Sequence, residues 1–138
     1  MPKALKVGYD ALVRSAKRNI REIEPETVLN DIASDKYTFI DVRDIRELKK
    51  TGRIPGSFHC PRGMLEFWVD PASPYYKPIF GEERNFVFYC WLDWRSALSA
   101  STAQAMGLEN VAHVKGGFKA WIDNGGPVEM LDDKPAVL

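Results

Sequence analysis

The apolar residues of this chain gather in short runs, and these runs are separated by polar stretches with helical spacing. The clearest run lies at 86–89, is wholly apolar or aromatic, and predicts a central buried strand. Runs at 37–40 and 111–114 predict further strands of a parallel sheet. A short strand is also expected at 57–60, where Pro61 ends it.

Helical spacing fills the intervals between these strands. Helices are expected at 24–34, at 43–50 before Gly52, at 95–106 before Gly107, and at 118–124 after a glycine pair. Strands that alternate with helices in this way favour a parallel sheet. The sequence therefore predicts an α/β fold, namely a parallel sheet with helices on both faces.

The segment from 62 to 84 breaks this regularity, because it mixes aromatic residues with prolines and glycines. We expect one short helix and an irregular aromatic excursion here. Such an excursion can line a site, as a substrate lid would. It can equally form a satellite cluster that covers one edge of the core, and the sequence slightly favours this cluster.

The first 21 residues are unusually basic, a balance that is also found in organelle transit peptides. Their apolar residues recur at helical spacing, which instead predicts a helix packed on the domain. These residues are Leu5, Tyr9, Leu12, Ala16 and Ile20. We therefore expect an N-terminal helical extension over 1–21, one domain over 22–130, and a C-terminal tail over 131–138.

Composition narrows the possible functions. The chain has 138 residues, of which 45% are apolar, as in one compact domain with its own core. Nineteen basic and nineteen acidic residues cancel, so there is no electrostatic case for binding nucleic acid or an anionic membrane. No apolar run approaches the roughly 18 residues that a membrane span needs. We expect a cytoplasmic protein, and the sequence does not indicate its oligomeric state.

The cysteine and histidine content points to thiol chemistry. Two cysteines, Cys60 and Cys90, are too few for a disulfide framework. With only His59 and His113 beside them, no zinc-ligand spacing appears, so we expect neither a metal nor another cofactor. A free reactive thiol in a reducing compartment fits this pattern better.

Cys90 is the candidate nucleophile, because it follows a predicted central strand directly. In open parallel sheets, ligands bind beyond the carboxyl ends of the strands. The segment Cys90 to Arg95 would point its backbone N–H groups, and the positive N-terminal end of the following helix, at the sulfur. The guanidinium of Arg95 would add a positive charge beside the sulfur. An inert buried cysteine is the alternative. We expect that structural role for Cys60, which lies between Phe58 and Pro61.

Four motifs in the same order resemble the rhodanese family, from about Glu22 to Pro127. Each motif is weak alone, but the ordered set is specific. They are Asp41-Val42-Arg43 with Glu47, Gly52-Arg53-Ile54-Pro55-Gly56-Ser57, the six-residue loop Cys90-Trp91-Leu92-Asp93-Trp94-Arg95, and Gly116-Gly117-Phe118-Lys119-Ala120-Trp121 with Gly126-Pro127.

The resemblance implies a rhodanese-like, doubly wound parallel sheet and the activity of a sulfurtransferase. Cys90 would take sulfane sulfur from a donor such as thiosulfate, hold it as a persulfide, and pass it to a thiophilic acceptor such as cyanide, a thiol or an acceptor protein. The amides of the loop would stabilise the persulfide anion. Asp41 and Arg43 would brace the loop from the neighbouring strand. Alternatively, these two residues form a turn cap and a helix pair between Arg43 and Glu47.

Asp93 departs from the family pattern, which usually has glycine at this position in a backbone of positive φ. Aspartate tolerates that conformation, so the loop can still form. Its carboxylate would disfavour a thiolate on Cys90 and repel thiosulfate, so Asp93→Gly is expected to raise activity with thiosulfate. Trp91 and Trp94 would narrow the mouth of the site or stack on a flat acceptor.

Two other functions remain open. Related phosphatases and arsenate reductases also pair cysteine and arginine in one loop, but they have five intervening residues where this chain has four. The other alternative is a non-enzymatic sulfur-relay or interaction module, whose partner docks near Trp91, Trp94 and the aromatic segment 64–80.

Overall fold

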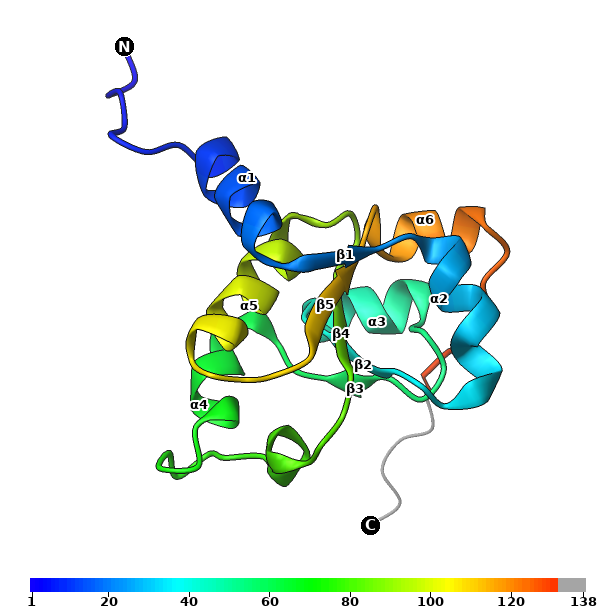
Figure 1. Cartoon of the computed structure of the whole chain (residues 1–138). Helices are drawn as coiled ribbons and strands as arrows, with labels where there is room; N and C mark the ends of the chain where they lie inside the picture. Colours follow the sequence, from blue (N-terminus) through cyan, green and yellow to red (C-terminus); the bar gives the residue numbers. More distant parts are fainter. Residues whose placement is uncertain (132–138) are drawn as a thin grey trace.

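The computed structural model describes residues 1–131 and shows a five-stranded, fully parallel sheet between two layers of helices (Figure 1). The strand order is β1-β5-β4-β2-β3. The strands are β1 (Arg21–Ile23), β2 (Thr38–Asp41), β3 (Phe58–His59), β4 (Phe86–Tyr89) and β5 (Val111–Val114). The strand predicted at 86–89 is thus the central strand, and the predicted C-terminal tail lies almost wholly outside the described residues.

Helices cover both faces of the sheet, which confirms the predicted doubly wound architecture (Figure 1). The helices form two layers because strand–helix–strand crossovers are right-handed. A crossover that moves toward β3 in the sheet places its helix on one face, and a crossover that moves toward β1 places its helix on the other face. One layer contains α1 (Tyr9–Asn19), α4 (Leu65–Val69) and α5 (Trp94–Ala105). The other contains α2 (Pro25–Asp31), α3 (Ile45–Thr51) and α6 (Gly117–Asp123).

The central strand β4 supplies the core on both sides. Successive side chains of a strand point to opposite faces. Phe86 and Phe88 therefore pack in the cluster under α1, α4 and α5, whereas Val87 and Tyr89 pack in the cluster under α2 and α6. All four residues are buried, as a run without polar positions predicts for a strand covered on both faces.

The N-terminal region contains one helix and an unexpected strand. α1 packs on α5 through Val13 and Ala16. The helix begins at Tyr9, and Leu5 lies outside it with 78% of its surface exposed. Sequence analysis missed β1, a three-residue edge strand beside β5 of which only Ile23 is buried.

The aromatic segment 62–84 closes one edge of the core. It contains α4 and two 3₁₀ turns, Arg62–Met64 and Pro78–Gly81, rather than the one short helix that was expected. Leu65, Val69 and Phe80 are buried in the cluster under α5. This packing favours the satellite-cluster interpretation over a lid. No helix among residues 1–131 is both long and apolar enough to cross a membrane.

Candidate active site

Cys90 lies at the carboxyl end of β4, as the first residue beyond the strand. The residue is only 1% exposed. Together with Trp91, Leu92, Trp94 and Arg95 it lines a cavity of about 290 Å³, called here the Cys90 pocket. The predicted loop residues are therefore brought together around one thiol, at the edge of the sheet where ligands of α/β proteins bind.

The N-terminal end of α6 orients the first peptides of the loop. The carbonyl of Cys90 accepts a hydrogen bond from the Phe118 N–H at 2.8 Å, and that of Trp91 accepts one from the Lys119 N–H at 3.0 Å. In a trans peptide, N–H and C=O point in opposite directions. The N–H groups of Trp91 and Leu92 are consequently turned away from α6.

This close approach depends on Gly117. Its φ is +69°, and a Cβ atom at this position would overlap the carbonyl of Leu92. Only glycine combines that backbone conformation with that lack of space. The glycine pair that opens α6 therefore allows the helix to dock directly on the loop.

Several loop amides are free to bind an anion. Among residues 1–131, no acceptor contacts the N–H groups of 91 to 95. The next N–H group, that of Ser96, donates to the Cys90 Sγ at 3.4 Å. Consecutive N–H groups without partners, at the first turn of a helix, form a nest that favours negative charge. The cradle around the sulfur stays a prediction, which the contact from Ser96 supports.

Arg95 lines the Cys90 pocket, but its charge is shared with Glu47. Its two terminal nitrogens donate to the two carboxylate oxygens of Glu47 at 2.8 and 3.0 Å. These hydrogen bonds raise the pKa of Arg95, with a smaller contribution from Cys90, and they lower the pKa of Glu47. The alternative pairing of Arg43 with Glu47 is wrong, because Glu47 is bound to Arg95.

Asp41 and Arg43 form a fully buried ion pair at the end of β2, with Nη2 and Oδ2 2.8 Å apart. Burial alone would lower the pKa of Arg43, but the hydrogen bonds and charge of Asp41 outweigh it and raise this pKa. Asp41 also accepts from the Arg43 backbone N–H at 3.0 Å, so the predicted turn cap is present as well. The guanidinium lies 4.6 Å from the ring centroid of Phe118, whose N–H binds Cys90. The ion pair therefore contacts Phe118, and Phe118 in turn binds the loop.

Asp93 braces the loop instead of facing its sulfur. Its φ is −161°, so the expected positive φ is wrong and glycine is not required here. The carboxylate is 2.9 Å from both the Gly116 N–H and the Lys17 Nζ, with 13% of the side chain exposed. Burial would raise the pKa of Asp93, but Lys17 and Gly116 lower it. Because Lys17 compensates this charge, the structure removes the basis for expecting that Asp93→Gly raises activity.

A buried polar chain, which sequence analysis missed, supports the first turn of α5. His113 Nε2 lies 2.8 Å from the Glu22 carboxylate, and its Nδ1 lies 3.0 Å from Ser96 Oγ. Burial lowers the pKa of His113, although Glu22 opposes this. A neutral ring fits these partners if Nε2–H donates to Glu22 and Nδ1 accepts from Ser96. The sequence signal was a histidine within an apolar strand, since buried polar groups need partners.

Aromatic side chains surround the opening of the Cys90 pocket. Trp94 is 50% exposed, and its ring centroid lies 5.0 Å from that of Tyr9 on α1. Trp91 packs edge-on against Phe118 and also lines an adjoining cavity of about 360 Å³ with Lys50 and others. No residue of the segment 62–84 lines either cavity.

The second cysteine has a different environment. Cys60 has no exposed surface, and burial raises the pKa of its thiol to about 12. It therefore remains a neutral thiol at physiological pH. This supports the structural role that was expected for it.

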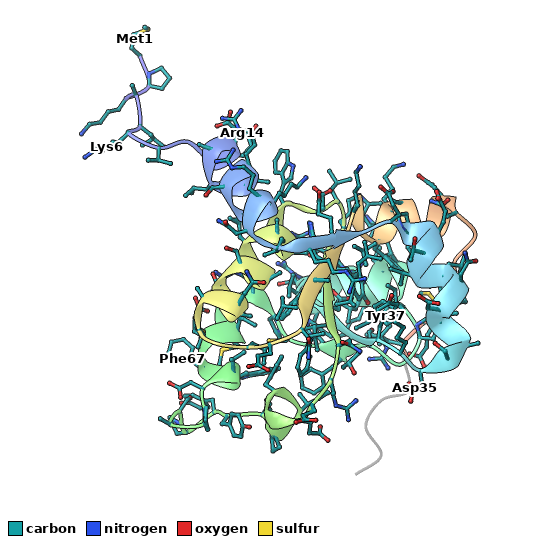
Figure 2. The ribbon with its side chains drawn as sticks, viewed as in Figure 1. Met1, Lys6, Arg14, Asp35, Tyr37 and Phe67 are labelled. Carbon is teal, nitrogen blue, oxygen red and sulfur yellow. The ribbon has the colours of Figure 1, made fainter. Side chains whose placement is uncertain are left out.

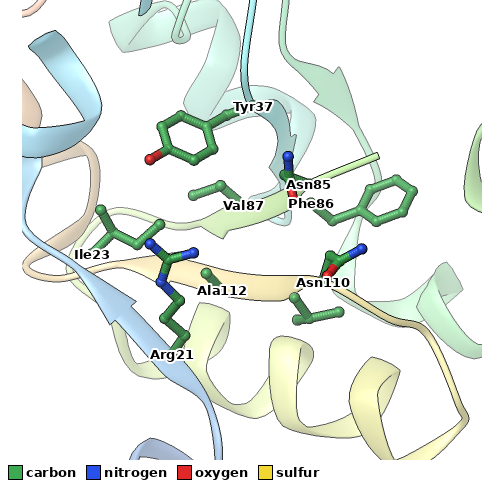
Figure 3. Close-up of a pocket in the computed structure, with 9 residues that line it drawn as sticks. Arg21, Ile23, Tyr37, Asn85, Phe86, Val87, Asn110 and Ala112 are labelled. Atoms are coloured by element: carbon green, nitrogen blue, oxygen red, sulfur yellow. The ribbon is translucent and has the colours of Figure 1, made fainter. Parts of the chain in front are cut away.

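A smaller cavity lies at the opposite edge of the sheet (Figure 3). It measures about 130 Å³ and lies near the amino-terminal ends of β1, β4 and β5. Figure 3 shows Arg21 extending from β1 beside Ala112, with Asn85 and Asn110 on the other side of the cavity. Its lining contains no cysteine, histidine or carboxylate, so it offers none of the chemistry found at Cys90.

Two known proteins are similar in sequence to this chain. A mouse protein named thiosulfate sulfurtransferase/rhodanese-like domain-containing protein 3 is 28% identical over 113 residues, covering 78% of this chain and 70% of the mouse protein. The thiosulfate sulfurtransferase GlpE of Glaesserella parasuis is 25% identical over 109 residues, covering 79% of this chain and 93% of GlpE.

A solved structure from Rhodopseudomonas palustris is also similar. It is 50% identical with a TM-score of 0.87, covers 94% of this chain and 99% of its own, and is described as a protein of unknown function and possible tyrosine phosphatase. The family described as rhodanese-like domain matches residues 24–124. Because that match spans most of the chain, the protein belongs to the rhodanese-like family, whose members similar to it include sulfurtransferases.

Proposed function

We propose that this protein is a sulfurtransferase that carries sulfane sulfur as a persulfide on Cys90. The Cys90 thiolate attacks the sulfane sulfur of a donor, the sulfur–sulfur bond of the donor breaks, and the leaving group departs with the bonding electrons. A thiophilic acceptor then takes the outer sulfur and returns Cys90 to the thiolate. Thiosulfate is a candidate donor, and cyanide, a thiol or an acceptor protein are candidate acceptors.

One observation carries this proposal. The N–H group of Ser96 points at the Cys90 sulfur, and the five preceding N–H groups, 91 to 95, have no acceptor among residues 1–131. Fixed N–H dipoles stabilise the anionic sulfur without reorganising during the reaction. Neither a metal nor another cofactor is needed in this cycle. It does require a free thiol, so we also propose a reducing compartment such as the cytoplasm.

A phosphatase is the main rival, because the similar R. palustris protein is described as a possible tyrosine phosphatase. Two features of this chain favour sulfur transfer instead. The loop from Cys90 to Arg95 has four intervening residues, one fewer than in the related phosphatases. The guanidinium of Arg95 is also held by both oxygens of Glu47, so it is less available to a phosphate.

The test is to incubate the protein with a panel of sulfur donors and acceptors. We expect a mass increase of one sulfur atom on the peptide containing Cys90, and thiocyanate when cyanide is added. Cys90→Ser should abolish both, whereas the matched variant Cys60→Ser should retain both. Sulfur on Cys60, or turnover of an aryl phosphate without persulfide formation, would contradict the proposal. Persulfide that passes only to a protein acceptor would indicate a relay module.

A further inference from the structure

The opening of the Cys90 pocket is apolar. Besides Cys90, its lining consists of two indole rings, one leucine and Arg95. Leu92 and Trp94 are about half exposed, so the opening presents large apolar side chains to solvent beside the nucleophile. Tyr9 extends the aromatic surface by packing against Trp94.

The charges around this opening are already paired within the protein. Arg95 is bound by Glu47 through two hydrogen bonds, and Lys17 is bound by Asp93 at 2.9 Å. These two pairs sum to no net charge. Lys50 lies in the adjoining cavity rather than in the Cys90 pocket.

Because these ion pairs leave no net positive charge, the Cys90 pocket disfavours a small inorganic dianion as the sulfur donor. When thiosulfate meets the Cys90 thiolate, three negative charges come together, and the loop amides can neutralise only part of them. Thiosulfate also has no apolar surface to bury against the two tryptophans. A donor with one charge brings only two negative charges together, and its apolar group gains the free energy of burial.

We infer that the sulfur donor is an organic compound whose sulfane sulfur is attached to an apolar or aromatic group, and that Trp91, Leu92 and Trp94 bind this group. The inference rests on the proposed sulfurtransferase function. Organic thiosulfonates represent the chemistry. The Cys90 thiolate attacks their terminal sulfur, the sulfur–sulfur bond breaks, and a sulfinate leaves with the electron pair, so that two negative charges are present before and after the step.

Two thiosulfonates with the same reactive group and the same charge provide the test. Benzenethiosulfonate carries a phenyl ring where methanethiosulfonate carries a methyl group. We expect kcat/KM for Cys90 persulfide formation, measured by mass spectrometry, to be roughly ten- to a hundredfold higher for the phenyl compound, as expected for burying such a group. Thiosulfate should be slowest. Each rate constant is divided by that of the same donor with a small free thiol, so that differences in the intrinsic reactivity of the donors cancel.

Variants locate the binding surface. Trp94→Ala should reduce the preference for the phenyl compound by severalfold, and Trp94→Phe should restore most of it. Phe67→Ala is the matched control, because Phe67 is 52% exposed on α4, far from α1 in Figure 2. It should leave the preference unchanged.

The outcomes separate this inference from the proposed function. Equal normalised rates for the two thiosulfonates, a faster reaction with thiosulfate, or an unchanged preference in Trp94→Ala would overturn the inference while leaving a sulfurtransferase. If no donor adds sulfur to Cys90, the proposed function itself fails and the inference fails with it.

Discussion

At the scale of single residues, the two cysteines differ in what surrounds their sulfur atoms. Both are buried, but only Cys90 faces a backbone N–H group and lines a pocket. Cys60 lies in the apolar cluster under α5, where burial disfavours its thiolate. Position in the sequence was enough to separate them, since Cys90 follows a strand and opens a polar loop.

Cys60 should be almost unreactive in the folded protein. Raising its pKa from 9.0 to about 12 lowers the thiolate fraction at pH 8 by roughly a thousandfold. Alkylation of the Cys60 peptide by iodoacetamide, followed by mass spectrometry, should be slower than that of free cysteine by about this factor. In urea the difference should disappear. Rapid alkylation of Cys60 without denaturant would show that burial does not control this thiol.

Other details of the site could not be predicted from local sequence. The conformation of Asp93 depends on Lys17 and Gly116, which come from distant parts of the chain. The pairing of Arg95 with Glu47 depends on how α3 lies against the loop. Local patterns identify the loop and its nucleophile, but tertiary packing decides which charges remain available.

At the scale of elements, α1 is part of the site although it lies outside the family match at 24–124. Lys17 binds Asp93, and Tyr9 packs on Trp94. Periodicity predicted that this helix packs on the domain. It could not predict which side chains reach the loop, because that depends on the angle at which α1 crosses α5.

Removing the contact between α1 and the loop should lower activity. Lys17→Met leaves the Asp93 carboxylate without its cation, so we expect kcat/KM for persulfide formation to fall severalfold. Asp93→Asn should cause a similar loss, and the double variant should lose less than the sum, with a coupling of about 0.5–3 kcal/mol. Asp93→Gly should now lower activity too.

Arg14→Met is the control for this experiment. Arg14 lies on the same helix (Figure 2). Its side chain is largely exposed and contacts only Asp10 among the described acidic residues. It should leave the kinetics unchanged. Additive effects of the Lys17 and Asp93 variants would mean that the contact does not support the loop.

At the scale of the whole molecule, the alternation of strands and helices was sufficient to predict a parallel sheet with helices on both faces, and the resemblance to the rhodanese family added the doubly wound arrangement. Strand order was not predictable, because short connections allow several right-handed arrangements. β1 was missed because it is short and largely exposed. Its importance is clear only in the folded protein, where Glu22 on β1 binds His113 on the neighbouring β5.

This link should make stability depend on pH. Burial lowers the native pKa of His113 below the ordinary histidine value of about 6.5, so the unfolded chain binds more protons just below pH 6.5. The contribution of neutral His113 is complete above pH 6.5 and is lost as the pH falls through the native pKa. Urea unfolding between pH 7.5 and 5 should show this loss, and His113→Gln should show a shallower decline. The same decline in both proteins would exclude His113 as its source.

The docking of α6 on the loop also has a consequence for biosynthesis. The peptides beside Cys90 are oriented by backbone N–H groups of α6, the last helix that the structure describes. Gly117 lets this helix approach the loop. Translation delivers this helix well after the cysteine. In a nascent chain the peptides beside Cys90 therefore stay unoriented until α6 has emerged from the ribosome, so the proposed persulfide chemistry begins only after α6 has docked on the loop.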